Sequence, residues 1–131
     1  MKITIFILVT FSSLLSCSTT NAWVSGAACY FPDSPNVKAP RWICQQQVSA
    51  QLLTAVGYAQ GSAIGAAFTK KMALADARVK LAQRLKGQCG VRYVSDAMLV
   101  NSRPLNTLRS PQGGHYVQLG IRPADLRLDC R

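Results

Sequence analysis

The sequence predicts an α+β domain in which one long helix packs on a small three- or four-stranded sheet, stapled by disulfide bonds. The 131 residues allow one domain of ordinary size. Residues 64–86 are rich in strong helix formers, whereas 52–59 and 115–122 are short and apolar, as strands are. Four cysteines remain once the N-terminal leader is set aside. These three observations together indicate the class.

The N-terminal residues 1–16 have the organisation of a secretory signal peptide. A short positive start precedes an apolar run, 3–15, that is shorter than the roughly 20 residues needed to span a bilayer. Leu14-Leu15-Ser16-Cys17 resembles the lipobox of bacterial lipoproteins, whose cysteine is acylated, and Ser18 after it favours the outer membrane. We therefore expect lipidation of Cys17 and a lipoprotein that faces the periplasm. The alternative is ordinary cleavage after Ala22, which gives a soluble periplasmic or secreted protein.

The remaining cysteines predict disulfide bonds, because exported chains fold in an oxidising compartment. Four cysteines allow three pairings. Local pairing, Cys29 with Cys44 and Cys89 with Cys130, requires the least prior organisation of the chain. A metal site is the weaker interpretation, since the chain has no Cys-x-x-Cys pair and His115 is its only histidine.

Composition divides the mature chain into a tether, 17–40, and a single folded domain, 41–131. The tether is rich in Ser, Thr, Asn and Pro, and its prolines favour turns or extended backbone. Trp42 opens the folded part, and we expect it to be a core residue.

The helix expected over 64–86 is the strongest local signal in the chain. Ser62 is a suitable N-cap, and Gly87 is expected to end the helix. Asp76 and Lys80 have the stabilising i, i+4 spacing on its polar side. Its apolar arc consists of Ile64, Ala67, Phe68, Met72, Leu74, Ala75, Val79, Leu81, Ala82 and Leu85.

Strands are expected on both sides of this helix. Residues 52–59 indicate a buried strand that ends in a turn. After the helix we expect a strand over 91–100, a proline- and glycine-rich loop over 102–114, and a strand over 115–122 with two-residue alternation. The order strand, helix, strand, strand lays the helix across one face of a small sheet.

Four short motifs make the chain similar to a known family. They are Pro40-x-Trp42-Ile43, Ala55-Val56-Gly57-Tyr58-Ala59, Ala73-x-Ala75-Asp76-Ala77-Arg78-x-x-Leu81-Ala82 and Tyr116-Val117-Gln118-Leu119. Across residues 40–122 they resemble the twenty-kilodalton lipoprotein family of bacterial envelope lipoproteins. That family includes a flagellar outer-membrane lipoprotein, and the N-terminal domain of a flagellar ring protein is similar to it. The resemblance implies a compact envelope domain that acts by assembly, in some members by building a ring around the flagellar motor.

The composition argues against catalysis. Five aspartates and no glutamate disfavour a paired-carboxylate hydrolase. His115, the one ordinary general base, follows two glycines and is expected at a strand edge or in solvent. Gly57, Gly61 and Gly65 form neither a Walker loop nor a dinucleotide fingerprint. We therefore expect a non-enzymatic structural protein without cofactor or metal, whose partners are envelope or flagellar basal-body proteins or further copies of itself.

Two other functions stay open. The formal charge of +10 suits anionic cell-wall polymers or lipid headgroups, whereas nucleic acid fits the charge but not the exported address. The candidate patch for such a partner is Lys70, Lys71, Lys80, Arg84, Lys86 and Arg92. A glycine-zipper membrane element is the other alternative, because 52–68 is uncharged and its glycines recur at every fourth position. We favour a strand, turn and helix there, because the span is short and contains polar residues.

Overall fold

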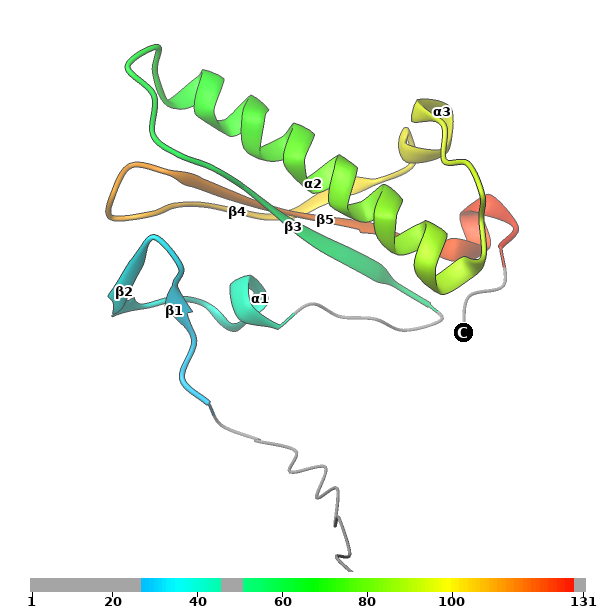
Figure 1. Cartoon of the computed structure of the whole chain (residues 1–131), viewed down its shortest axis with the longest axis horizontal. Coiled ribbons are helices and arrows are strands. Elements are labelled where there is room, and N and C mark those ends of the chain that lie inside the picture. The colour runs from blue at the N-terminus through cyan, green and yellow to red at the C-terminus, as the bar shows by residue number, and fades with distance from the viewer. Residues whose placement is uncertain (1–26, 46–50, 129–131) are drawn as a thin grey trace, which may run out of the picture.

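The computed structural model describes residues 27–45 and 51–128 (Figure 1). The signal peptide, Cys17, the cleavage position after Ala22 and Cys130 lie outside this part, so the predictions about them stay predictions. The elements in order are β1 (Tyr30–Phe31), β2 (Ser34–Lys38), α1 (Arg41–Cys44), β3 (Leu53–Ala59), α2 (Ala66–Cys89), α3 (Asp96–Leu99), β4 (Arg103–Arg109), β5 (His115–Ile121) and the short 3-10 helix η1 (Pro123–Leu126).

The main sheet is antiparallel, with β5 between β3 and β4. The strands predicted over 52–59 and 115–122 are confirmed as β3 and β5. Because side chains alternate along a strand, Val117, Leu119 and Ile121 of β5 point to one face, where they form a core with α2. The helix crosses this face over β3 and β5 (Figure 1). The predicted class, one long helix on a small sheet, is confirmed.

Small side chains allow α2 to lie directly on the sheet. Its fully buried residues are Thr69, Ala73, Ala77, Leu81 and Leu85. They recur at every fourth position and therefore form one narrow stripe along the helix. Gly57 of β3 lies under this stripe, where a Cβ would lie 2.7 Å from the Cα of Ala77 and closer still to the backbone of Ala73. Helix and strand thus meet backbone to backbone.

The predicted apolar arc of the helix is confirmed only in part: Leu81 and Leu85 are fully buried, as expected. Four other large residues of the arc, Ile64, Phe68, Met72 and Val79, are exposed. Beside Gly57 the buried positions of the helix are Ala73 and Ala77, whose small side chains permit the close backbone contact. Gly57, Gly61 and Gly65 do not share one helix face, because Gly57 lies in β3 and α2 begins only after Gly65. The strand, turn and helix that we expected in place of a glycine zipper are therefore present.

The ends of α2 also differ from the prediction. Ser62 accepts a hydrogen bond from the Ile64 N–H, but the helix begins two residues later, after Gly65. It continues past Gly87 to Cys89, where Gly90 takes a left-handed conformation (φ 65°) and ends it.

The strand predicted over 91–100 and the loop predicted over 102–114 are wrong. The first stretch holds α3, whose N-cap Ser95 accepts a hydrogen bond from the backbone N–H of Met98. The second holds β4, in which Pro104 precedes a bulge in the pairing with β5. Proline is tolerated there because β4 is an edge strand.

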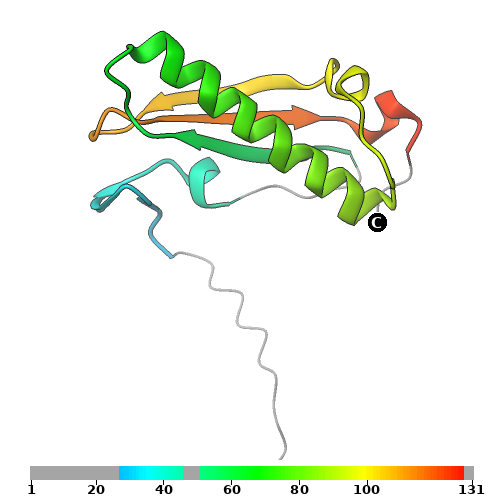
Figure 2. The ribbon, with the colours of Figure 1, turned by 45° about the horizontal axis from the view of Figure 1, so that its top comes forward.

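Residues 27–45, here called the N-terminal segment, pack on the face of the sheet opposite α2 (Figure 2). Phe31 and Ile43 are buried there against Tyr116 and Val56, and Trp42 is half-buried at the edge of this second core. The described part of the predicted tether is therefore folded onto the domain.

The pairing of Cys29 with Cys44 is confirmed, with an S–S distance of 2.05 Å. This bond joins the residue before the β1–β2 hairpin to the end of α1, and so closes the N-terminal segment on itself. Cys89 is also engaged in a disulfide bond, and Cys130, its predicted partner, lies beyond the described residues.

Candidate interaction surfaces

One carboxylate holds the N-terminal segment on the sheet. Asp33, in the β1–β2 turn, accepts hydrogen bonds from the hydroxyls of Ser110, of Tyr58 at 3.3 Å and of Tyr116 at 3.1 Å. Ser110 Oγ also accepts a hydrogen bond from the backbone N–H of Gly114 at 3.0 Å. Asp33 thus ties the hairpin to β3, β5 and the β4–β5 turn, and sequence reasoning missed it because it lies in the predicted tether.

This hydroxyl cluster has the geometry of an anchor. A nucleophilic serine needs a base within reach of its hydroxyl. The only histidine, His115, lies one residue before Tyr116 on β5, so it points to the opposite face from Asp33 and Ser110. The carboxylate and hydroxyls satisfy one another, as buried polar groups do.

The anchor predicts a loss of stability in alkali. Burial, followed by the hydrogen bond to Asp33, raises the pKa of Tyr116, and burial and the Asp33 charge raise that of Tyr58. Because their unfolded value is about 10, stability present below that pH is lost as the pH rises above it. We expect urea midpoints to fall above about pH 10, and Tyr116→Phe to weaken this dependence. An identical pH profile in wild type and variant would contradict the assignment.

His115 lies at the edge of a strand, as the first residue of β5, and not in solvent. It is half-buried between Ala59 and Arg109 on the neighbouring strands, and its Nδ1 has no hydrogen-bond partner within the described residues. Burial, and then the charges of Arg109 and Lys70, lower the pKa of His115 and so favour the neutral form of the ring. No group of three His, Cys, Asp or Glu side chains in the described ranges could hold a metal ion.

The six cations of the predicted patch do not form one face. Lys80 pairs with Asp76 at 2.7 Å and lines a hollow with Arg84 on one side of α2. Lys70 lies on the other side, in a groove between α2 and β4. The remaining members, Lys71, Lys86 and Arg92, are exposed.

The outward side of α2 carries an unpartnered apolar row, here called the outer row. It consists of Ile64 just before the helix and Phe68, Met72 and Val79 on it, with 74%, 40%, 49% and 57% of their surface exposed. Figure 2 shows α2 as the outermost layer on this side of the sheet. In a usual surface helix the large apolar residues face the core. Near Gly57 the residues of α2 that face the core are Ala73 and Ala77, and Leu81 and Leu85 do so only further along, whereas the outer row faces water.

The second candidate surface is the edge strand β4, which pairs with β5 on one side only. All its residues are exposed except the half-buried Leu108. Neither α2 nor the N-terminal segment covers it. Three hollows of about 160, 410 and 280 Å³ share Leu105, which is 44% exposed. The hollows lie towards α2, towards Trp42 and towards η1, respectively. We call β4 with these hollows the β4 surface.

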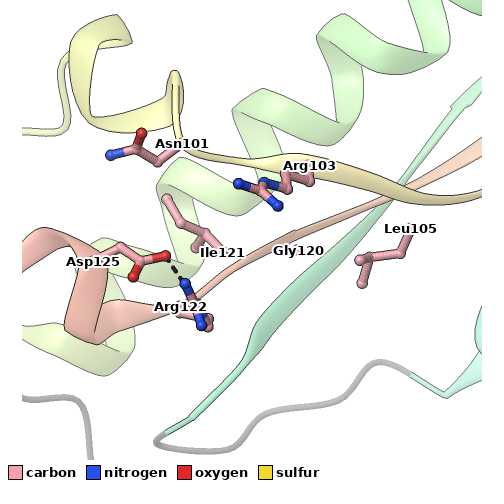
Figure 3. A pocket seen from close by; sticks show the side chains of 7 residues that line it. All are labelled: Asn101, Arg103, Leu105, Gly120, Ile121, Arg122 and Asp125. Atoms are coloured by element: carbon pink, nitrogen blue, oxygen red, sulfur yellow. Dashed lines mark hydrogen bonds and ion pairs between the residues drawn. The ribbon is translucent and has the colours of Figure 1, made fainter.

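The hollow next to η1 is lined by charged side chains (Figure 3). Arg103 extends from β4 on one side, and Arg122 pairs with Asp125 at 3.0 Å on the other. Leu105 lies over Gly120, where a Cβ would come within 2.6 Å of its side chain. Glycine on the central strand therefore makes the room that Leu105 occupies.

Comparisons of this chain with protein-family models, with curated proteins and with solved structures give no match. Of the helices in the described residues, none has the length and apolar character needed to cross a membrane.

Proposed function

We propose that this chain is a lipid-anchored lipoprotein of the bacterial outer membrane with a structural, non-enzymatic role in envelope assembly. The observation that carries the proposal is the β4 surface. An edge strand offers backbone hydrogen-bonding groups along one side and side-chain positions on both faces, which suits a protein partner. Leu105 supplies an apolar contact, and Arg103 and Arg109 supply charges at the two ends of the strand.

Features of β4 favour a specific partner over open-ended stacking. Pro104 and the bulge that follows interrupt regular pairing in the first half of the strand. An antiparallel pairing of β4 with a second β4 in full register would bring Arg103 opposite Arg109, and like charges directly opposite are destabilising. Residues 106–109 stay regular and accessible to an extended segment of another protein.

The N-terminal segment supports the anchored arrangement. The Cys29–Cys44 bond favours an oxidising compartment. The bond closes the N-terminal segment, and Asp33 holds this segment on the sheet. The start of the folded domain, near Cys29, is therefore fixed in place. From Cys17 to Ala27 the chain can extend at most about 36 Å. A lipid on Cys17 would therefore keep the domain close to its leaflet.

Photo-crosslinking in living cells tests the assembly role. A benzophenone amino acid at Leu105 is expected to give discrete adducts with few envelope proteins, because this position is the centre of the β4 surface. The same group at Val37 of β2, similarly exposed at 41%, is the matched control and should not give these adducts. Adducts with basal-body proteins would favour a flagellar role, and adducts with a second copy would favour a ring. The same adducts at both positions, or none at Leu105, would contradict the proposal.

Metabolic labelling tests the anchor separately. Labelled palmitate should enter the wild-type chain and not the Cys17→Ser variant. A wild-type chain without label, cleaved after Ala22, would show that the protein is not lipidated.

Binding of anionic cell-wall polymers is the alternative function, favoured by the exposed cations Lys71, Lys86 and Arg92. It predicts that retention on isolated sacculi weakens as salt is added and when these residues are replaced by glutamine. Retention that neither change alters would exclude it.

A further inference from the structure

We propose that the outer row of α2 lies on the surface of an anionic phospholipid bilayer, as a membrane contact separate from the N-terminal lipid. The inference rests on the proposed function in one respect, that the exported chain works beside a membrane. It does not depend on the β4 surface or on acylation of Cys17.

The first argument is that large apolar side chains are exposed along one side of α2. The outer row places three large side chains at helical spacing on one side of α2, and Ile64 continues it at the start of the helix. From Phe68 to Val79 the row covers about 16 Å of helix length. Several large apolar side chains exposed along one helix mark an interaction site, and a helix lying in the plane of a bilayer buries such a row at the acyl boundary.

The second argument is the charge around the row. Helical spacing puts Lys71 and Arg78 along one flank, and Lys86 extends the outward side towards the end of the helix; all three are exposed. The only acid of α2, Asp76, lies between Met72 and Val79 at helical spacing, and its carboxylate accepts a hydrogen bond from the Tyr58 N–H of β3 and pairs with Lys80. Lys80 therefore offsets the one negative charge beside the row, and the remaining cations give this side an excess of positive charge that an anionic leaflet attracts.

Other possible partners of the outer row would match either its apolar side chains or its cations, but not both. A second copy of α2 would bring Lys71 and Arg78 against like charges. Anionic cell-wall polymers would match the cations but offer no apolar phase for Phe68 and Met72. A leaflet of anionic phospholipid supplies both, and α2 is placed on the outside of the domain, where it can lie flat (Figure 2).

Vesicle sedimentation tests the proposal directly. The chain from residue 17, carrying Cys17→Ser and exported behind an ordinary signal peptide that is removed completely, lacks lipid and is mixed with vesicles of phosphatidylglycerol or of phosphatidylcholine. We expect at least about tenfold tighter binding to phosphatidylglycerol, with the difference falling as salt is added. The double substitution Phe68→Ser and Met72→Ser should weaken binding by about tenfold or more, because it removes two large apolar side chains that the bilayer would bury.

The matched control is Val37→Ser, which removes a similarly exposed apolar side chain outside both the row and the β4 surface and should leave vesicle binding unchanged. Thermal unfolding of each variant checks that the fold is retained. Equal binding to both lipids, or unchanged binding by the Phe68/Met72 variant, would overturn the proposal. So would a concentration-dependent dimer that this variant abolishes, because the row would then hold a second copy. None of these outcomes affects the crosslinking at Leu105, so the two proposals fail separately.

Discussion

Replacing Gly57 with alanine is expected to destabilise the domain by about 3 kcal/mol or more, although the change adds a single methyl group. The added Cβ would overlap the backbone of α2 at Ala73 and Ala77, and backbone atoms cannot turn aside as a flexible side chain can. The helix would have to lift from β3, which opens the core where Leu81 and Leu85 are fully buried. A small domain has only about 5–15 kcal/mol of stability, so this loss is a large share of it.

Gly87 provides the matched control for this experiment. It lies in α2, where an added Cβ would have nothing within 4 Å, and its φ lies in the ordinary helical range. Gly87→Ala should therefore stabilise the domain by up to about 1 kcal/mol, because alanine is the better helix former. Urea unfolding followed by circular dichroism measures both variants. A Gly57→Ala variant as stable as wild type would mean that α2 and β3 do not meet backbone to backbone.

The same contact explains why the class of fold was predictable from the sequence, whereas the side of α2 that is buried near Gly57 was not. Helix propensity and strand alternation are local properties, and they identified α2, β3 and β5 closely. Which side of an amphipathic helix faces the sheet depends on the partner strand. Gly57 selects Ala73 and Ala77 for the buried side, although the size of the side chains favours Phe68 and Met72.

Both candidate surfaces follow from residues whose role is set by tertiary context. Pro104 indicated a loop, yet it begins an edge strand, where a missing N–H is tolerated. The stretch Leu105-Asn106-Thr107-Leu108, with no glycine or proline, was the signal that could have identified β4. The outer row was recognised as apolar from the sequence but assigned to the core. Asp33 was not identified, because nothing local distinguishes a carboxylate in a turn from one that accepts three hydroxyl hydrogen bonds.

Removal of the Cys29–Cys44 bond is expected to lower the free energy of unfolding by about 3 kcal/mol, the entropic effect of opening a loop of this size. The two cysteines are 15 positions apart in the sequence. The double substitution Cys29→Ser and Cys44→Ser avoids a free thiol and leaves Cys89 unchanged. Wild type and variant are compared by urea unfolding without reductant, since reductant would also attack the bond that Cys89 makes.

The loss of stability should be confined to the N-terminal segment, and limited proteolysis can locate it. Without the bond, the Asp33 hydrogen bonds and the small core around Phe31 and Tyr116 must hold the N-terminal segment alone. We expect limited proteolysis to cut within 27–45 before it cuts α2, because the larger core between α2 and the sheet does not include this segment. Adding Asp33→Asn should then release the segment further, with a larger effect in the serine variant than in wild type, because the two restraints act on the same hairpin. Unchanged stability of the serine variant, together with an unchanged cleavage pattern, would mean that the carboxylate alone fixes the segment to the sheet.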